Sequence, residues 1–312
     1  MRVFLWHVHG AYTNSLVQGA HEYLLPVVPE RSQDGLGRSQ TFEWPANVLE
    51  LSEEEAADAE VDVVILQRPE ELGGLAERWL GGRRPGRDVP VLYLEHSLPQ
   101  GRIADMRHAA ADRDDLLLVH VTHFNALFWD SGSTRTRVIE HGIVDPGYRY
   151  TGELASAAVV INEPGRRGRV TGTDLLPSLN GRVPLDVFGL GTEALGGYGD
   201  VAPPRLWDEM ARRRVYLHPI RWTSLGFSLL EAMHLGMPVV ALATTEVVEA
   251  VPTEAGVVST NIDLLARGLQ RLVSHGEEPR ERGIAGRRAA LERYGLERFL
   301  ADWDAVLDEV TA

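Results

Sequence analysis

The chain has 312 residues, of which 44% are hydrophobic and 24% are charged, so its composition is globular and its length suits two domains. Its formal net charge of −14 argues against nucleic acid as a partner, because binding a polyanion requires a concentrated field of Lys and Arg. The lack of cysteine excludes disulfides, thiolate catalysis and cysteine-type zinc sites.

The N-terminus leads directly into the apolar residues 2–6, without the basic region, long apolar run and cleavage site of a signal peptide. No window approaches the ~20 apolar residues of a membrane-spanning helix. We therefore expect a soluble, cytoplasmic protein with no integral membrane segment.

Short apolar segments alternate with helical patterns in the first half of the chain. Helices are expected at residues 53–59 and 69–80, and a polar loop at residues 31–38. The apolar segments predict strands at residues 2–8, 61–66, 89–94, 116–121 and 138–139. This alternation is typical of a parallel α/β sheet.

A second α/β series follows residues 145–147, so a domain boundary is expected near residue 150. Residues 165–169 are predicted to form a basic loop. The series predicts strands at 157–161, 184–188, 215–218 and 237–242, and helices at 206–213, 229–235, 262–274 and twice within 280–311. Two such sheets leave a cleft between them, and ligands bind at the carboxyl ends of their strands.

The clearest chemical signal lies in residues 218–243. Residues 224–228 form a small, flexible loop, and residues 229–235 predict a helix that ends at Gly236. Free N–H groups at the start of such a helix suit an anionic ligand. Glu231 lies one turn into the helix, where its carboxylate could accept hydrogen bonds from sugar hydroxyls.

This segment resembles that of retaining glycosyltransferases with the GT-B fold, specifically glycosyltransferase family 4. The resemblance rests on Glu231-Ala-Met233, Gly236 and Pro238-Val-Val240. It implies an α/β fold of two Rossmann-like domains facing a cleft. Residues 1–150 would form the acceptor-side domain and residues 151–312 the donor-binding domain, with the last helix a candidate for packing back on the first domain.

The resemblance implies transfer of a sugar, of the hexosyl class, from a nucleotide-diphosphate donor to a hydroxyl acceptor with retention of configuration. The acceptor would be a small molecule or a glycan, and neither a metal nor another cofactor would be required. In the family, a glutamate at the Glu231 position binds the nucleotide ribose. A second family glutamate, eight positions earlier, contacts the donor sugar, but Thr223 stands there in this chain. The backbone expected over the sugar and diphosphate belongs to Ser224, Leu225, Gly226 and Phe227.

The family also places an arginine and a lysine after the first strand of the second domain, where they clamp the diphosphate. Arg166 aligns with this arginine and is the candidate for stabilising the leaving group. The lysine position falls on Thr171, so Arg167 or Arg169 would have to supply the missing charge.

Three matches lie in the first half of the chain. The segment His9, Gly10 and Ala11 resembles the acceptor-side loop of the family. His96 matches a strand-end histidine that the family places near the reacting sugar, and it is a candidate catalytic residue. Residues 141–145 resemble an Asn-Gly-Val-Asp segment at the domain junction, with His141 replacing asparagine.

Simpler interpretations remain for each signal. The segment 218–243 could be an ordinary α/β unit, the arginines a solvated loop, and His96 a structural histidine. Residues 189–194 fit a dinucleotide fingerprint, but further glycines follow where a helix should begin. The acidic pair at residues 112–114 resembles the metal-binding pair of the other glycosyltransferase fold. It precedes a strand instead of following one, so it is expected to end a helix.

Two other functions are compatible with parts of the sequence. His7 and His9 could form half of the metal site of a hydrolase, completed by His120, His123 or His218. That function would require an eight-stranded barrel. Alternatively, the replacements at Thr223 and Thr171 could leave a nucleotide-binding module that has the fold but no transfer activity.

Overall fold

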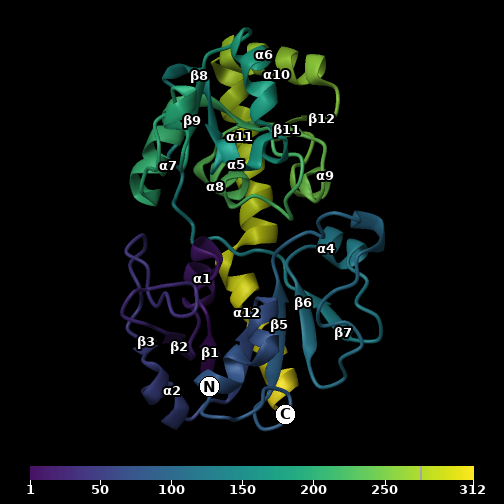
Figure 1. The fold of residues 1–312 in the computed structure, drawn as a ribbon. Coiled ribbons are helices and arrows are strands. Elements are labelled where there is room, and N and C mark those ends of the chain that lie inside the picture. The colour runs from purple at the N-terminus through teal and green to yellow at the C-terminus, as the bar shows by residue number, and fades with distance from the viewer. Residues whose placement is uncertain (275) are drawn as a thin grey trace. The chain divides into compact units, whose positions relative to one another are not determined.

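The computed structural model describes residues 1–274 and 276–312, which form two compact α/β units (Figure 1). The first unit contains residues 1–142 and 296–312, and the second contains residues 143–295. Residues 143–150, which were predicted to belong to the first domain, thus belong to the second unit. Within the described ranges, no helix combines the length and apolar character needed to cross a membrane.

The first unit is built on a parallel seven-stranded sheet with the order β3-β2-β1-β4-β5-β6-β7. Because β1 lies between β2 and β4, the order reverses at β1, which is the type of position where ligands of such sheets bind. The strands are β1 (Arg2–Leu5), β2 (Glu22–Pro26), β3 (Val48–Leu51), β4 (Val63–Leu66), β5 (Val91–Glu95), β6 (Leu117–His120) and β7 (Arg135–Val138).

The helices of this unit are α1 (Gly10–Leu16), α2 (Glu53–Asp58), α3 (Ala76–Trp79), α4 (His123–Phe128) and α12 (Leu296–Thr311). In Figure 1, α12 (yellow) lies alongside the strands of this unit. Its buried Trp303 donates a hydrogen bond from Nε1 to the hydroxyl of Tyr12 in α1, at 3.1 Å. The last helix is thus part of the first unit's core.

The second unit has a parallel five-stranded sheet with the order β12-β11-β10-β8-β9. Its strands are β8 (Leu154–Val160), β9 (Leu185–Phe188), β10 (Arg213–His218), β11 (Val239–Leu242) and β12 (Gly256–Ser259). Its helices are α5 (Pro164–Arg167), α6 (Leu176–Asn180), α7 (Pro203–Arg212), α8 (Phe227–Leu235), α9 (Val247–Ala250), α10 (Ile262–Ser274) and α11 (Glu277–Tyr294).

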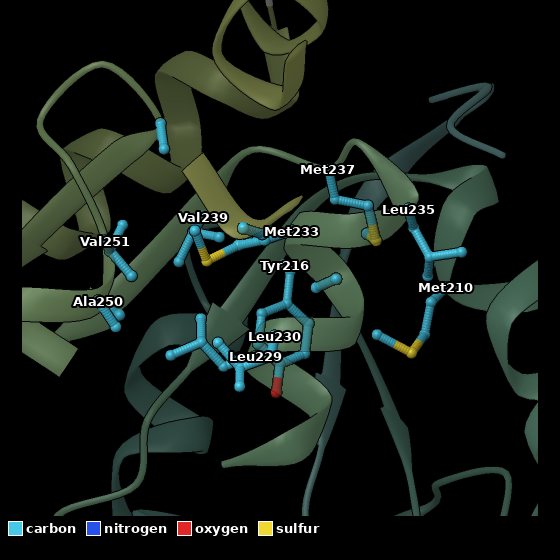
Figure 2. Packing of buried hydrophobic residues seen from close by; sticks show 14 of the residues in the cluster. Met210, Tyr216, Leu229, Leu230, Met233, Leu235, Met237, Val239, Ala250 and Val251 are labelled. Carbon is cyan, nitrogen blue, oxygen red and sulfur yellow. The ribbon is translucent and has the colours of Figure 1, made fainter. Parts of the chain in front are cut away.

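Helices cover both faces of the second sheet, so β10 alternates between two apolar clusters. Tyr216 belongs to the cluster that contains the α8 side chains, and Figure 2 shows it among Leu229, Leu230 and Met233. Val215 and Leu217 belong to the cluster on the α10 side. Burial on both faces explains why the interior strand β11, Val239–Leu242, is a continuous apolar run.

Gly236 ends α8 in the left-handed conformation, at φ 84°, as its position after the helical pattern predicted. Together the two open parallel sheets confirm the predicted α/β class with two Rossmann-like domains. They also rule out the eight-stranded barrel, and with it the fold that a hydrolase built on His7 and His9 would require.

Four local predictions differ from the structure. The segment 165–169 is not a loop: it lies in α5 and a following 3-10 turn, Gly168–Thr171. Gly10 and Ala11 begin α1, whose N-cap is His9. No helix ends at residues 112–114, where Asp112 adopts φ 61° in a turn. The helix expected at 69–80 is divided, because Gly74, inside the π-helical turn Glu71–Leu75, adopts φ 110° just before α3 begins.

Candidate active site

Three loops meet at the carboxyl edge of the second sheet, where β10 lies between β8 and β11. The loop after β10 donates a hydrogen bond from the Arg221 N–H to the carbonyl of Val170 in the loop after β8, at 2.8 Å. On its other side, the carbonyl of Ile220 accepts a hydrogen bond from Thr244 Oγ1 in the loop after β11, at 2.9 Å. The loop after β10, which carries the candidate residues 223–226, is therefore held from both sides.

A bidentate ion pair strengthens the junction between the first two loops. The guanidinium of Arg221 donates to both oxygens of Asp174, at 2.5 and 2.9 Å, and to the carbonyl of Arg169 at 2.6 Å. Arg169 also binds Asp174, at 2.8 Å. The hydrogen bonds from Arg221 lower the pKa of Asp174, so its carboxylate stays ionised and the loops stay joined.

The three candidate arginines differ in what they already bind. Arg166 pairs with Glu163, with Nε at 2.9 Å from Oε1, and Arg169 is held by Asp174. In the described part of the chain, half-buried Arg167 has no carboxylate within ion-pair distance. Burial and its neighbour Arg166 lower its pKa, and the charge of Glu163 opposes this shift. Of the three, Arg167 therefore has the guanidinium that is most available to an incoming anion.

Thr171, at the lysine position of the family, is fully buried. Its hydroxyl contacts the carbonyl of Gly168 at 3.0 Å and the hydroxyl of Thr173 at 2.8 Å. Both contacts lie within the loop itself, so Thr171 maintains the shape of the turn. Positive charge for a diphosphate at this edge must therefore come from Arg166, Arg167 or Arg169.

The loop at residues 223–226 passes directly over the end of β10. Ser224 and Leu225 are buried, whereas Thr223 and Phe227 are half-buried. Gly226 is the N-cap of α8, and a Cβ atom there would lie 2.7 Å from Cε1 of His218. Close packing on this histidine thus requires glycine at position 226.

Glu231 is half-buried in α8. Burial raises its pKa to about 7, and its interaction with the side chain of Trp207 in α7 opposes this rise. Its carboxyl group is therefore poised between its two protonation states near neutral pH. A ligand whose hydroxyl groups donate to this carboxyl would favour the ionised form.

In the first unit, the predicted residues His9 and His96 lie together at the carboxyl edge of the sheet. His9 follows β1, His96 follows β5, and their ring centroids are 4.1 Å apart. The Tyr12 ring contacts His96 at 4.6 Å and His141 at 5.8 Å. Burial lowers the pKa of His9 to about 4 and that of His96 well below 6.5. Both rings are accordingly neutral at pH 7.

The other acceptor-side candidates, Gly10 and Ala11, follow His9 in the chain. Gly10 faces Phe42, whose Cε2 atom would lie 3.1 Å from an added Cβ, and half-buried Ala11 follows it in α1. His7 is turned toward a different partner, since its Nδ1 atom lies 2.8 Å from the carbonyl oxygen of Gly37. Across residues 1–274 and 276–312, no group of three or more His, Asp or Glu side chains could hold a metal ion.

Nothing in the sequence alone points to Asp174, Arg221 or Gln67 as parts of these sites. Gln67 directly follows β4 and contacts His96 through its side chain. Asp174 and Arg221 are 47 positions apart, so no local pattern links them. They meet only because β8 and β10 are neighbours in the sheet.

The chain is similar to known proteins in one segment of its sequence and in its overall fold. Residues 191–275, which include the loop at 223–227 and Glu231, match the family described as Glycosyl transferases group 1. None of the curated proteins matches the chain. Sucrose-phosphate synthase from Thermosynechococcus elongatus has a similar structure, with a TM-score of 0.73 at 14% identity, covering 99% of this chain and 98% of that one.

Two further solved structures are similar. HepE from Anabaena, crystallised with UDP, has a TM-score of 0.69 at 15% identity and covers 99% of both chains. TarM from S. aureus, also crystallised with UDP, has a TM-score of 0.61 at 13% identity, over 78% of this chain and 55% of that one. The chain thus has the two-domain, Rossmann-like GT-B fold, and its second unit carries a segment of the glycosyl transferases group 1 type.

Proposed function

We propose that this protein is a glycosyltransferase that moves a sugar from a nucleoside diphosphate donor to a hydroxyl acceptor with retention of configuration. One observation carries the proposal: Arg167, which has no ion pair among the described residues, follows β8, and Glu231, whose pKa is raised, follows β10, so both lie beyond the carboxyl edge of the second sheet. The first suits a diphosphate and the second suits ribose hydroxyls. The match of residues 191–275 to a glycosyltransferase family supports this assignment.

In the proposed reaction, the bond between the anomeric carbon and the donor phosphate breaks, and its electron pair goes to the phosphate. The acceptor hydroxyl oxygen bonds to the same carbon, and its proton passes to the leaving phosphate. Neither a carboxylate nucleophile nor a metal is then required. Arg167 and Arg166 would stabilise the charge on the leaving diphosphate, while His96 would contribute on the acceptor side.

Arg167→Ala is expected to weaken the binding of UDP by about tenfold or more, since it removes a charge-assisted hydrogen bond donor. Arg166→Ala should have a smaller effect, because Glu163 already neutralises Arg166. Titration calorimetry with UDP measures both values, and Arg205→Ala, which removes an exposed arginine of α7, serves as the control. A wild-type protein that binds no nucleoside diphosphate would contradict the proposed function itself.

A second candidate is a nucleotide-binding module without transferase activity. Thr223 provides no charge at the position of the first family glutamate, and the hydroxyl of Thr171 is used within its own loop. An assay of donor hydrolysis combined with a screen of acceptors distinguishes the two functions. Nucleotide binding with no turnover on any acceptor would favour the module.

A further inference from the structure

Gln67 is a buried amide at the carboxyl end of β4, between β1 and β5 in the sheet order. Its Nε2 atom lies 2.6 Å from the carbonyl oxygen of Trp6, and its Oε1 atom lies 2.9 Å from Nε2 of His96. A backbone carbonyl can only accept, so the amide NH₂ must face Trp6. The amide oxygen is then left for His96, whose Nε2 atom must carry the hydrogen.

The backbone of Gln67 is held in place as well. Its N–H donates to Oε2 of Glu71 at 2.5 Å, and the other oxygen of Glu71 accepts from Arg68 Nε at 2.6 Å. The Glu71 side chain is fully buried. The side-chain amide itself is fixed by Trp6, because a flipped amide would set its oxygen against the carbonyl oxygen of Trp6.

We propose that Gln67 is a positioning residue that fixes His96 as the Nε2–H tautomer, so that Nδ1 presents a lone pair to a hydroxyl group of the substrate. This inference rests on the proposed function, because it concerns the histidine assigned to the acceptor side. Among the described residues, Nδ1 of His96 has no hydrogen-bond partner of its own. A neutral imidazole with the hydrogen on one nitrogen is an acceptor at the other.

The groups around His96 keep it neutral. His9 and Tyr12 face it from α1, and His141 lies near it from the segment after β7. Burial lowers the pKa of His96, and His9 and His141 lower it further.

The nearest other charges do not reverse this effect. The carboxylate of Glu95 is bound to the Ser97 N–H at 2.6 Å and to Nε2 of His108 at 2.9 Å. On α12, Arg298 donates to the carbonyl of His141 and is itself a cation. His96 is thus an acceptor across the neutral and mildly acidic range, and the group that it recognises is a hydrogen-bond donor such as a sugar hydroxyl.

Gln67→Glu tests this role with almost no change in shape. A carboxylate beside Nε2 is expected to raise the pKa of His96. At mildly acidic pH, Nδ1 then gains a proton and can no longer accept a hydrogen bond from the substrate hydroxyl. Between pH 8 and pH 6, we expect kcat/KM of the variant to fall at least fivefold more than kcat/KM of the wild type, which itself falls as Glu231 is protonated. His96 of the wild type does not titrate in this range and should contribute no such fall.

Gln67→Met removes the hydrogen bond without adding a charge, and it should lower kcat/KM by about fivefold to tenfold at every pH, the value of one hydrogen bond. Gln18→Glu, at an exposed glutamine of the same unit, is the charge control. UDP binding should stay unchanged in all three variants, since the second unit holds the donor. A wild type that fails to bind UDP would therefore count against the proposed function and not against Gln67.

The tautomer can be read without any activity. Ring ¹⁵N chemical shifts of the full chain, labelled at histidine and assigned with His96→Gln, should show His96 with its hydrogen on Nε2 in the wild type. They should show a mixture of tautomers in Gln67→Met. An Nδ1–H tautomer in the wild type, or pH profiles that are identical for wild type and Gln67→Glu, would overturn the proposal.

Discussion

Glu231→Gln is expected to stabilise the protein at pH 8 and at the same time to weaken nucleotide binding. Burial raises the pKa of Glu231 from 4.5 to about 7. Between these two values, the unfolded chain loses the proton more readily than the folded protein does. The folded state thus bears a penalty that begins above pH 4.5 and is complete above pH 7. Glutamine removes it, and we expect a gain of about 1–3 kcal/mol in the free energy of unfolding at pH 8.

The gain should shrink toward pH 5, where Glu231 is protonated in the folded protein. Thermal unfolding at pH 5 and pH 8 measures both values. Glu249→Gln, at an exposed position of α9, should change neither. Equal melting temperatures for wild type and Glu231→Gln at pH 8 would show that the buried carboxyl group carries no such penalty.

Binding should change in the opposite direction. If the ionised carboxylate accepts hydrogen bonds from the ribose, Glu231→Gln loses a charged acceptor, and the affinity for UDP should fall by about tenfold or more. For the wild type, the affinity should rise roughly tenfold from pH 6 to pH 8, as the ionised fraction of a group with this pKa rises. A pH-independent affinity would remove Glu231 from the ribose site. A variant that is more stable and yet binds less well would point to a functional rather than a structural reason for the buried acid.

Features encoded in a single segment of the chain were predictable. The helix at 262–274 has its apolar residues on one face, and it forms with the predicted limits. The end of α8 at Gly236 was predictable because it depends only on local hydrogen bonds, from the Gly236 N–H to the carbonyls of Ala232 and Met233. The strand β3 was missed, since Val48-Leu-Glu-Leu51 is a short strand at the edge of the sheet with only one fully buried residue.

The contacts that shape the sites depend on sheet order, which no local pattern reveals. Gln67 and His96 are 29 positions apart and meet because β4 and β5 are adjacent. The predicted basic loop contained the right arginines. However, only the structure shows that Glu163 pairs with Arg166 and Asp174 with Arg169, while Arg167 forms no ion pair within residues 1–274 and 276–312. The sequence therefore indicated where the charge lies but not which guanidinium is available.

Gly172→Ala is expected to separate the two loops that carry the donor-site candidates. Gly172 lies in the left-handed region at φ 74°, and an added Cβ would overlap the carbonyl oxygen of Pro219. Both the backbone conformation and the contact oppose any side chain, and we expect a loss of about 1–3 kcal/mol in stability. Because Pro219 belongs to the loop after β10, the clash pushes this loop away from the loop after β8.

The larger effect should be on binding. The Arg221–Asp174 ion pair and the Arg221–Val170 hydrogen bond span the same junction, so displacing it moves Arg167 relative to the start of α8. A ligand that must contact both loops loses affinity steeply when their spacing changes, since each contact depends on the other. We expect UDP affinity to fall at least tenfold by calorimetry.

Gly165→Ala provides the matched control, because Gly165 lies in α5 of the same loop and nothing lies within 4 Å of an added Cβ. This variant should bind UDP as the wild type does, and its stability should be unchanged or slightly higher. Normal binding by a folded Gly172→Ala would mean that the ligand contacts only one of the two loops. In that case the assignment of the donor site would rest on Glu231 alone, without the arginines of the loop after β8. A selective loss in Gly172→Ala would instead place the diphosphate across the junction that Arg221 and Asp174 hold together.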